Sequence, residues 1–528
     1  MLVCSIIAIV LAVICVVYEF HRQLMMLQQN SYRNDRYKRW CTTSQDSTST
    51  MRLVTGAVAL ASLSTLSVPM VSLGLVTIIS VVNIFSLAGR KYKKPLVMTR
   101  RAWRILVTML VLAAIPMAGV IVFCVLDHHS LDRAAVAGLI IFCFSQLFLL
   151  AANWLLKPVE AHINRKYYLD AERILKSMPD LKIIGITGSY GKTSTKHYLN
   201  RILSEKYDVM MTPGSFNTTM GVIRTVREYL KPYNEVFIVE MGAKQPNDIK
   251  EICDLVHPSV GIVTAVGEQH LESFKTIENV QRTKFELVDS LPADGLAVVN
   301  DDFPYVANRP VSNVECVRYA VTAKDAAAYT AEEISYTPQG TSFTVVTPVG
   351  ERLPFSTRLV GECNVSNLLA AIIVALRMDV PVEKIRYAVS NIEQVEHRLN
   401  MKRTPGGVTI IDDAFNSNPT GSKMALDVLK MMTGGRRIIV TPGMIELGDR
   451  QAELNEKFGA AIADSADIAI VVGAYNREAI IAGIESVEPR QAKVYKVNSF
   501  AESQQLLTTM LKPGDTILYE NDLPDTFK

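Results

Sequence analysis

Long apolar segments dominate the first 156 residues of the chain. Residues 2–18 contain no charged side chain, and residues 105–126 and 134–156 each exceed the ~20 apolar residues that a helix needs to cross ~30 Å of hydrocarbon. Residues 2–18 lack the basic start and the small-residue cleavage site of a signal peptide, so we expect a retained helix. Residues 53–89 are too long for a single crossing, because they would form a helix of about 55 Å.

The charges that flank residues 53–89 decide how this segment is arranged. Both flanks, residues 19–52 and 90–104, are rich in Lys and Arg, and the second contains no acidic residue. Both are therefore expected in the cytoplasm, so residues 53–89 cross an even number of times and turn near residues 62–69. We predict five transmembrane helices, an external N-terminus and a cytoplasmic position for everything after Lys157. A re-entrant hairpin at residues 53–89 is the alternative, and it leaves the orientation unchanged.

The composition agrees with a membrane domain at residues 1–156 that is joined to a water-soluble enzyme. Hydrophobic residues make up 49% of the 528 residues and charged residues only 20%. Residues 1–156 carry 14 Lys and Arg against five Asp and Glu, whereas the remainder carries 41 against 47. This asymmetry argues against a nucleic-acid partner, and the lack of acidic residues inside the expected spans argues against ion-coupled transport. The eight cysteines show no paired spacing, so neither disulfides nor a zinc site is expected.

Beyond a linker helix at residues 157–180, short apolar runs alternate with stretches of helix length. Strands are predicted over residues 181–187, 236–240, 261–265 and 296–300, and in a second series over residues 408–411, 437–441, 468–472 and 516–519. Alternation of this kind predicts α/β domains with largely parallel sheets. Because Thr404-Pro405-Gly406-Gly407 interrupts the pattern, we divide this part into a central domain at residues 181–400 and a Rossmann-like C-terminal domain at residues 401–528.

A glycine-rich turn follows the first predicted strand. It reads Thr187-Gly188-Ser189-Tyr190-Gly191-Lys192-Thr193-Ser194, and a helical pattern starts at Lys192. Glycines let backbone N–H groups turn towards phosphate oxygens, the lysine neutralises the terminal phosphates, and the adjacent hydroxyl reaches Mg²⁺. The general pattern GxxxxGK[ST] fails at one position, because Ile186 stands where it requires glycine. The strand before the turn and the helix after it still favour a P-loop ATPase-like central domain that binds ATP and Mg²⁺.

This turn resembles the nucleotide loop of the Mur ligases, the ATP-dependent amide-forming enzymes of peptidoglycan assembly. Further motifs follow in the order found in that family, at residues 214–221, 239–243, 270–274 with Lys284, 361–367, 398–399, 412–419 and 444–448. The resemblance covers residues 181–500. It is strongest to the branch that adds D-alanyl-D-alanine, MurF.

The resemblance implies that ATP converts a carboxylate to an acyl phosphate, which an incoming amine then attacks. The residues implied to bind ATP lie in the turn and in the later motifs: Gly188, Ser189, Gly191, Lys192, Thr193, Ser194, Asn364, Asn367, Arg398 and Asp413. The metal set implied for Mg²⁺ is Thr193, Glu240, His270 and Lys284, with Lys284 carbamylated by CO₂. The catalytic set is Lys192, Lys284 and His270.

Each assignment has a simpler structural alternative. Glu240 ends a strand, where acids often only face solvent, and His270 alone is more often a hydrogen-bonded structural residue. Lys284 can pair with Glu286 across a helix end. Asn364 and Asn367 can be a helix cap and a surface amide instead of adenine contacts. The role of Asn416 stays open.

The chain also departs from the family pattern. Cys363 replaces the usual histidine of one motif, and Pro442-Gly443 replaces Gly-Asp. The C-terminus reads Glu520-Asn521-Asp522 where the branch has a basic Lys-Gly-Ser, and membrane segments stand in place of the domain that grips the UDP-sugar. These departures leave the expected ATP chemistry intact. They put in doubt which acceptor the enzyme uses.

We therefore predict an ATP-dependent, ADP-forming carboxylate–amine ligase of cell-wall precursor synthesis at the inner leaflet of the cell membrane. Its donor is an amino acid or a dipeptide. Its acceptor is a muramoyl-peptide-like molecule, either UDP-linked or lipid-linked, and the membrane domain in place of the sugar-binding domain favours the lipid-linked form. A polyglutamate-forming or amidating ligase of the same type is one alternative, and a non-catalytic ATP-binding membrane scaffold is another.

Overall fold

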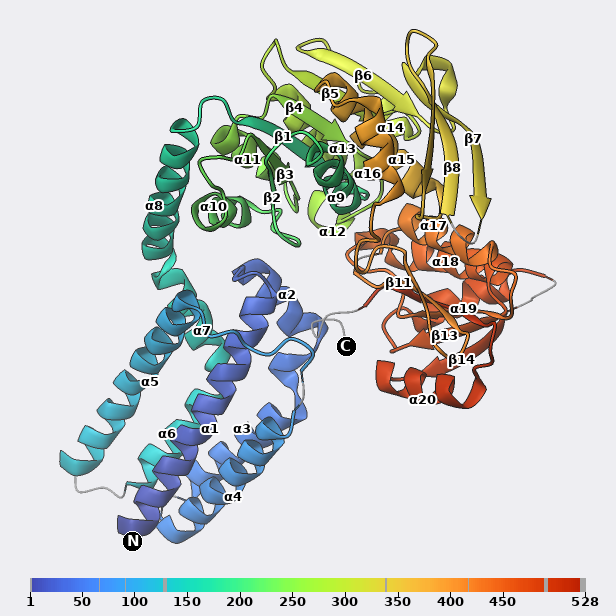
Figure 1. The fold of residues 1–528 in the computed structure, drawn as a ribbon. Helices are drawn as coiled ribbons and strands as arrows, with labels where there is room; N and C mark the ends of the chain where they lie inside the picture. Colours follow the sequence, from blue (N-terminus) through green and yellow to red (C-terminus); the bar gives the residue numbers. More distant parts are fainter. Residues whose placement is uncertain are drawn as a thin grey trace. The chain divides into compact units, whose positions relative to one another are not determined.

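The computed structural model describes residues 2–65, 67–90, 92–126, 131–337, 340–415, 417–488 and 492–522. Asn416 lies outside these residues, as does the tail that follows Asp522. The described chain forms two compact units, an N-terminal one up to Arg165 and a second one over Lys166–Asp522, which Figure 1 shows in blue to teal and in teal to red. The four-part division made from the sequence stays a prediction.

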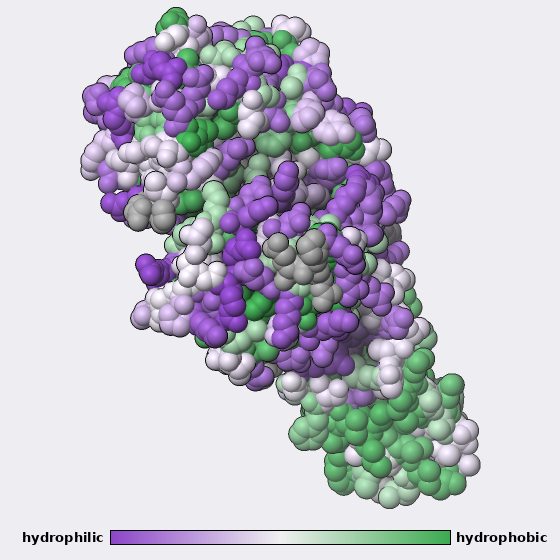
Figure 2. Space-filling view, turned by 90° about the vertical axis from the view of Figure 1, so that its right-hand side faces the viewer, coloured by the Kyte–Doolittle hydropathy of each residue, from purple (hydrophilic) through white to green (hydrophobic). Residues whose placement is uncertain are grey.

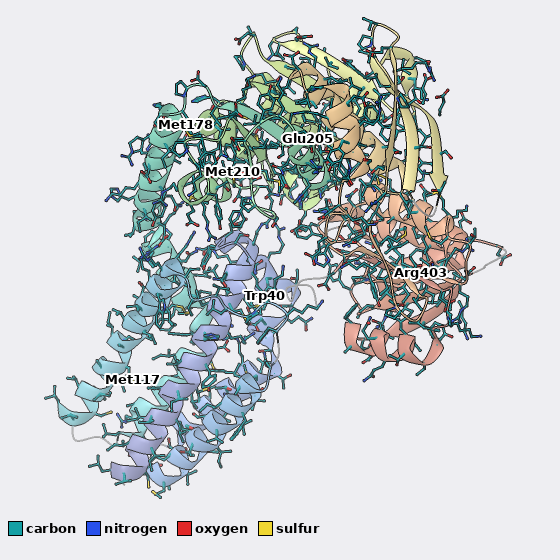
Figure 3. The ribbon with its side chains drawn as sticks, in the orientation of Figure 1. Trp40, Met117, Met178, Glu205, Met210 and Arg403 are labelled. Carbon is teal, nitrogen blue, oxygen red and sulfur yellow. The ribbon has the colours of Figure 1, made fainter. Side chains whose placement is uncertain are left out.

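The N-terminal unit is helical (Figure 1). Its described elements are α1 (Leu2–Gln29), α2 (Asn34–Thr43), η1 (Asp46–Thr48), α3 (Thr50–Ser64), α4 (Pro69–Ala88), α5 (Arg100–Leu126), α6 (Asp132–Cys143), α7 (Ser145–Leu155) and the first half of α8 (Lys157–Lys176). Helix α1 packs against α4 and α6, and α3 packs against α4. Two apolar clusters hold these helices together, one around Phe20, Met109 and Phe142 and one around Ala12, Val76 and Leu139. In Figure 3, Trp40 marks α2 and Met117 marks α5.

Helix lengths do not support five membrane spans. Among the described residues three helices are long and apolar enough to cross a membrane, namely α1, α4 and α5, and the bent pair α6 and α7 counts as a fourth if it is one span. Helix α3 has 15 residues and reaches only about 22 Å. The expected double crossing at residues 53–89 therefore contains one full-length helix and one short one, and the run at residues 134–156 bends by 68°.

The outward surface of these helices is apolar. Exposed large hydrophobic side chains include Ile7 and Val10 on α1, Phe85 on α4, and Ile115 and Leu126 on α5. Figure 2 shows this surface as a hydrophobic region over the N-terminal unit, in contrast to the polar surface of the other unit. Exposed apolar area of this extent is typical of a surface that contacts a membrane or a partner.

Buried charges link the helices at one end of this unit. The Arg52 guanidinium donates to the carbonyl oxygens of Phe142 at 3.1 Å and Cys143 at 2.8 Å, the last residues of α6. The same side chain pairs with Glu19 of α1 and, at 3.4 Å, with Asp46. Arg22 also pairs with Asp46, at 2.7 Å. Because terminal helix carbonyls have no partner within the helix, Arg52 satisfies the groups that the break between α6 and α7 exposes.

The second unit starts with a nine-stranded sheet in the order β2-β3-β1-β4-β5-β6-β7-β8-β9. Its strands are β1 (Lys182–Thr187), β2 (Val209–Met211), β3 (Val236–Glu240), β4 (Val260–Val263), β5 (Leu296–Asn300), β6 (Glu315–Ala320), β7 (Tyr329–Thr337), β8 (Gly340–Val346) and β9 (Arg352–Thr357). Strands β1 to β7 pair in parallel, whereas β8 and β9 pair antiparallel. The predicted parallel sheet is thus confirmed, and the antiparallel extension was not foreseen.

Helices cover both faces of this sheet (Figure 1). They are α9 (Lys192–Leu203), α10 (Thr219–Glu228), α11 (Asp248–Val256), α12 (Leu271–Phe274), α13 (Ile277–Asp289), α14 (Pro304–Ala307), η2 (Lys324–Ala326), α15 (Glu362–Arg377) and α16 (Val382–Ser390). Side chains alternate across the strands, so Ile184 packs with α9 and α15 in one cluster while Ile183 packs with α11 and α13 in another. Strands buried on both faces require such continuous apolar runs.

A six-stranded sheet follows, in the order β10-β11-β15-β12-β13-β14. Its strands are β10 (Asn400–Arg403), β11 (Thr409–Asp413), β12 (Arg437–Thr441), β13 (Ile468–Val472), β14 (Lys493–Val497) and β15 (Thr516–Glu520), with α17 (Pro419–Lys430), η3 (Gly448–Arg450), α18 (Gln451–Ser465), α19 (Arg477–Glu485) and α20 (Phe500–Met510) around them. All pairs are parallel except β10 with β11. This arrangement confirms the second predicted α/β series.

Candidate active site

The glycine-rich turn lies at the carboxyl end of β1, next to the ends of β3 and β4. Gly191 has φ +81°, and an added Cβ would stand 2.5 Å from the Asn367 amide oxygen. At Gly188 the same atom would stand 2.0 Å from the Thr264 hydroxyl. Only glycine fits such close approaches. The backbone thus forms the tight cradle that was predicted between a strand and the N-terminus of α9.

Within this turn, Ser189 is structural. Its hydroxyl donates to the Gly267 carbonyl at 3.0 Å and accepts from the Gly267 N–H at 3.1 Å. Ser194 lies buried on α9. The Ser189 hydroxyl thus holds the turn against Gly267, and the predicted contact of both serines with ATP stays a prediction.

The Lys192 ammonium folds back over the turn. It donates to the carbonyl oxygens of Gly188 at 2.6 Å and Ser189 at 3.3 Å. Burial lowers its pKa to about 8, although Glu240 opposes this shift. A cation held by two neutral carbonyls gains a better partner when a phosphate enters, because charge-assisted hydrogen bonds are the stronger ones.

Glu240 ends β3 and is 1% exposed. One carboxylate oxygen accepts from Thr193 at 3.2 Å and from Asn217 at 3.1 Å, while the other pairs with the wholly buried Lys196 at 3.0 Å. Burial would raise the pKa of Glu240, but Lys196 and Lys192 together lower it. The carboxylate is therefore ionised and held by cations, which excludes the simple solvent-facing alternative.

Lys284 lies on α13 and is 2% exposed. Among the described residues its ammonium makes no hydrogen bond or ion pair, and Glu286 instead accepts from the backbone N–H groups of Asn247 at 2.7 Å and Lys250 at 3.0 Å. Burial lowers the pKa of Lys284 to about 7, and the positive charge of Lys192 adds to the shift. A neutral amine at physiological pH is nucleophilic.

His270 connects the two sheets of this unit. Its Nδ1 bonds the carboxylate of Glu446, and the Glu446 carbonyl accepts from the Glu272 N–H at 3.1 Å. Both His270 and Glu446 have left-handed backbones, at φ +54° and +61°. Burial lowers the pKa of His270, against the effect of Glu446. The predicted role of His270 at the metal stays a prediction, because this ring is bound to a carboxylate of the C-terminal sheet region.

The two asparagines of α15 hold helices together. Asn364 accepts from the Tyr198 hydroxyl at 2.7 Å and donates to the Val360 carbonyl at 2.9 Å, and Asn367 accepts from Thr195 at 3.2 Å. Both are buried, so neither is a surface amide. Adenine contact by these residues stays a prediction.

Arg398 and Asp413 lie together at the start of the C-terminal sheet. The Arg398 guanidinium stacks 4.4 Å from the Phe415 ring centre, and the Leu399 N–H donates to Asp413 at 3.1 Å. Burial lowers the pKa of Arg398, while Asp413 and Glu240 oppose this shift. Arg398 is thus close enough to the glycine-rich turn to act on its charges.

The residues around Glu240 fit ATP and Mg²⁺. The Thr193 hydroxyl and one Glu240 carboxylate oxygen lie 3.2 Å apart, and the described residues contain no group of three or more His, Cys, Asp or Glu side chains able to hold a metal ion. Mg²⁺ prefers few protein oxygens that are completed by phosphates and water, whereas zinc needs a denser set. The cradle and this sparse set therefore suit a magnesium–nucleotide complex.

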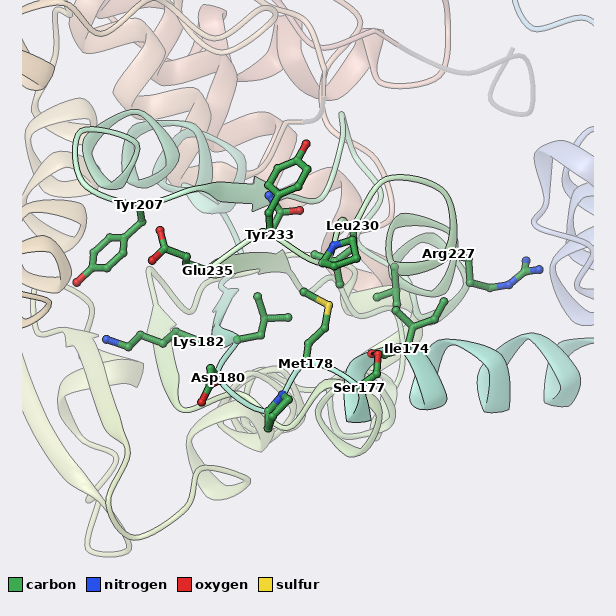
Figure 4. A pocket seen from close by; sticks show the side chains of 15 residues that line it. Ile174, Ser177, Met178, Asp180, Lys182, Tyr207, Arg227, Leu230, Tyr233 and Glu235 are labelled. Atoms are coloured by element: carbon green, nitrogen blue, oxygen red, sulfur yellow. The ribbon is translucent and has the colours of Figure 1, made fainter.

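A separate cavity of about 680 Å³ lies at the other end of β1 (Figure 4). It is lined by the end of α8, by the start of β1 at Lys182 and by the loop between α10 and β3, with Met178, Leu230 and Tyr233 among its side chains. Because the glycine-rich turn follows the carboxyl end of the same strand, this cavity is not part of the site described above.

A phosphate cradle at a strand end, an ionised glutamate beside a threonine and a buried lysine define an ATP-dependent enzyme with a P-loop-like central sheet. Residues 186–375 match the Mur ligase middle domain, and residues 397–519 match the Mur ligase, glutamate ligase domain. The chain belongs to the Mur ligase family, whose members are ATP-dependent, ADP-forming ligases.

Relatives and solved structures agree with this assignment. The chain is 29% identical over 349 residues to a UDP-N-acetylmuramoyl-tripeptide–D-alanyl-D-alanine ligase of Bacillus subtilis, covering 64% of this chain and 72% of the relative. It is 30% identical over 367 residues to the ligase of the same name from Mycobacterium bovis, covering 64% and 70%. The crystal structure of MurF from Acinetobacter baumannii superposes with a TM-score of 0.61 at 25% identity, over 67% of this chain and 77% of that one.

The sequence analysis assigned no role to three residues that complete the site, although two of them, Asn217 and Glu446, lie within the motifs at residues 214–221 and 444–448. Lys196 neutralises Glu240, Asn217 donates to it, and Glu446 holds His270. Lys196 follows Lys192 by one helical turn, which places both on one face of α9, so helical spacing was a usable signal. Glu446 is separated from His270 by 176 positions, and no local pattern indicates that contact.

Proposed function

We propose that this protein is a MurF-like ligase that uses ATP to join an amine donor to the carboxylate of a muramoyl-peptide acceptor through an acyl phosphate. The observation that carries the proposal is the arrangement around Lys192. The Thr193–Glu240 pair lies beside it, and the buried Lys284 is near enough for Lys192 to depress its pKa. The names of the relatives supply the substrate class, which is UDP-N-acetylmuramoyl-tripeptide and D-alanyl-D-alanine.

The protein's own groups have defined tasks in this reaction. ATP supplies the phosphoryl group that activates the carboxylate, and Mg²⁺ neutralises the phosphate charge. When ATP is bound, Lys192 would leave the Gly188 and Ser189 carbonyls for the phosphates, and Thr193 and Glu240 would hold the metal. A neutral Lys284 amine would add CO₂: an N–C bond forms, one C–O π bond breaks, one proton leaves the nitrogen, and the resulting carbamate would offer an anionic oxygen to the metal.

The reaction is tested by measuring ADP and phosphate release from the full chain in detergent micelles. Release is expected only when ATP, UDP-muramoyl-tripeptide and D-alanyl-D-alanine are all present. Lys284→Ala is expected to lose turnover and to retain binding of an ATP analogue, whereas Arg282→Ala, an exposed position on the same helix, is expected to keep both. Phosphate release that ignores the acceptor, or full turnover by Lys284→Ala, contradicts the proposal.

We also propose that the N-terminal unit is embedded in the cell membrane with the second unit in the cytoplasm. Its support is the apolar surface of α1, α4 and α5 and the basic segments on both sides of residues 53–89. Protease added to right-side-out spheroplasts is expected to leave the second unit intact, and protease added to inverted vesicles is expected to degrade it. The opposite pattern, or release of the chain from membranes by carbonate, contradicts this placement.

A membrane-embedded ligase favours an acceptor that is itself lipid-linked, because both then diffuse in one plane. Turnover of the chain in vesicles is therefore expected to be faster with a lipid-linked muramoyl-tripeptide than with its soluble UDP form at equal concentration. Faster turnover with the soluble acceptor contradicts this part of the proposal and leaves the ligase assignment standing.

A further inference from the structure

The basic segment that follows α4 forms an ordered surface at one end of the N-terminal unit, the end where α1 is followed by α2 (Figure 1). Residues 90–104 contain seven Lys and Arg and no acidic residue. The Gln28 side chain accepts from the Val97 N–H at 2.9 Å and donates to the Val97 carbonyl at 2.8 Å, and Gln29 donates to the Lys94 carbonyl at 2.9 Å. The last turn of α1 therefore holds the backbone of this segment in place.

Cations gather where α5 begins. The first turn of this helix contains Arg100 and Arg101 and no acidic residue, and Arg104 lies one turn further on. Because the N-terminus of a helix carries partial positive charge, these arginines and the helix end together favour an anion. Glu160 of α8 pairs with Arg104 at 2.6 Å and, more loosely, with Arg101 at 3.8 Å. We call the cationic side chains of this surface the basic face: Lys93, Lys94, Arg100, Arg101 and Arg104, of which Lys93, Lys94 and Arg100 are exposed.

Two exposed tryptophans lie at the same end of the unit. Trp103 stands between Arg101 and Arg104 in the sequence of α5 and is 54% exposed, and Trp154 at the end of α7 is 67% exposed. Asn153, the neighbour of Trp154, donates to the Tyr32 carbonyl at 3.0 Å, and the Arg101 guanidinium lies 4.3 Å from the centre of the Tyr32 ring. Tryptophan rings favour the headgroup level of a bilayer. In the membrane placement proposed above, the basic face is therefore at the level of the lipid headgroups.

We propose that the basic face binds the phosphate group of a membrane lipid, with Lys93, Lys94 and Arg100 as the main contacts. Phosphate oxygens accept charge-assisted hydrogen bonds from Lys and Arg, and such residues next to a membrane helix attract anionic headgroups. The apolar side chains of Val97 and Val107, which are 62% and 51% exposed, offer a surface to the acyl chains of the same lipid. A water-soluble anion would leave these side chains uncovered, so charge and apolar area together favour a lipid. The inference rests on the proposed membrane placement and adds the class of lipid to it.

Tryptophan fluorescence of the full chain in phosphatidylcholine vesicles tests the site, because bromine atoms on lipid acyl chains quench the rings that they touch. Trp103 and Trp154 report from the basic face, whereas Trp40 is 7% exposed and serves as the background. Quenching by brominated phosphatidylglycerol, which is anionic, is compared with quenching by the same share of brominated phosphatidylcholine, which is neutral overall. The test variant combines Lys93→Gln, Lys94→Gln and Arg100→Gln. The control is Arg133→Gln, which removes a cation from the first turn of α6 at the other end of the unit.

In the unmodified protein and in Arg133→Gln, phosphatidylglycerol is expected to associate about tenfold more strongly than phosphatidylcholine, because each cation near an anionic surface adds roughly fivefold. The triple variant is expected to lose most of this selectivity and to keep the quenching by phosphatidylcholine, which shows that it is still folded in the bilayer. Equal quenching by both lipids in the unmodified protein, or selectivity that survives in the triple variant or is lost equally in Arg133→Gln, overturns the proposal and leaves the membrane placement standing. If neither lipid quenches the unmodified protein, the membrane placement itself fails, and this proposal fails with it.

Two lipids carry the proposed chemistry, namely an anionic phospholipid of the leaflet and the lipid diphosphate of a lipid-linked acceptor. Unlabelled polyprenyl diphosphate and unlabelled phosphatidylglycerol, each added as a competitor of brominated phosphatidylglycerol, distinguish them. Recovery of fluorescence at a lower mole fraction of the diphosphate assigns the basic face to the acceptor. Recovery at the same or a higher mole fraction of the diphosphate assigns it to the phospholipids of the leaflet. No recovery with either competitor overturns the proposal, because the quenching then does not depend on a phosphate site.

Discussion

Lys284 allows a quantitative test of how much the burial of its amine destabilises the folded protein. Its pKa falls from 10.5 to about 7, chiefly through burial. At 1.36 kcal/mol per pKa unit, the folded protein is destabilised by about 5 kcal/mol when both states are protonated. Because the unfolded chain binds this proton more tightly, stability rises with pH between about 7 and 10.5. The penalty is complete below pH 7 and falls to about 2 kcal/mol at pH 9.

Replacing Lys284 by Met removes the buried charge while keeping a flexible chain of similar size. We expect Lys284→Met to be more stable than the unmodified protein by up to about 5 kcal/mol at pH 6.5, with a smaller gain of about 2 kcal/mol at pH 9. The same variant is expected to lose ligase turnover.

Calorimetric unfolding of the full chain in micelles measures these differences. The buffers must be free of CO₂, because carbamylation replaces the cation by an anion. Arg282→Met, an exposed change on the same helix, is expected to show no pH-dependent gain. The reasoning is refuted if Lys284→Met is no more stable than the unmodified protein at pH 6.5, or if its gain in stability is the same at both pH values. In either case Lys284 is not a buried amine with a lowered pKa.

Three further predictions concern the surrounding site. Gly191→Ala is expected to cost about 1–3 kcal/mol in unfolding free energy and to weaken binding of an ATP analogue, because the new Cβ meets the Asn367 amide at a left-handed position; unchanged affinity contradicts the cradle. Glu240→Gln is expected to cost about 3–5 kcal/mol by leaving Lys196 as an unpaired buried cation, and Glu240→Gln with Lys196→Met is expected to recover most of it in a double-mutant cycle. Glu446→Gln is expected to weaken the contact with the histidine that bridges the two sheets and to reduce turnover more than nucleotide binding; equal loss of both contradicts this.

The strands that the sequence predicts best are those buried on both faces. Residues 236–240, 296–300, 437–441 and 468–472 form strands with the expected bounds, since uninterrupted apolar runs of that length have few other structures available. Strand β7 begins buried and then alternates between half-buried and exposed positions. Because β7 shows both the pattern of a buried strand and that of a half-exposed one, the sequence did not reveal that the sheet continues beyond it. The antiparallel strands β8 and β9 were therefore not predicted.

In the site, local motifs were predictable and long-range partners were not. Lys192, Thr193 and Glu240 lie together because the ends of adjacent parallel strands meet at one sheet edge. The contact between His270 and Glu446 joins residues 176 positions apart, which only the fold brings together. In the N-terminal unit, hydrophobic length alone overestimated the number of candidate membrane spans, because hydropathy does not reveal where a helix breaks.

The way Arg52 is held has a practical consequence for dissecting the protein. Its guanidinium pairs with Glu19 of α1. It also donates hydrogen bonds to the backbone carbonyls of Phe142 and Cys143, at the end of α6. Deleting only the leading helix would remove Glu19 together with Arg22 and leave Arg52 with Asp46, at 3.4 Å, as its acidic partner. A shortened version should therefore leave out the whole N-terminal unit, whose boundary with the second unit falls between Arg165 and Lys166.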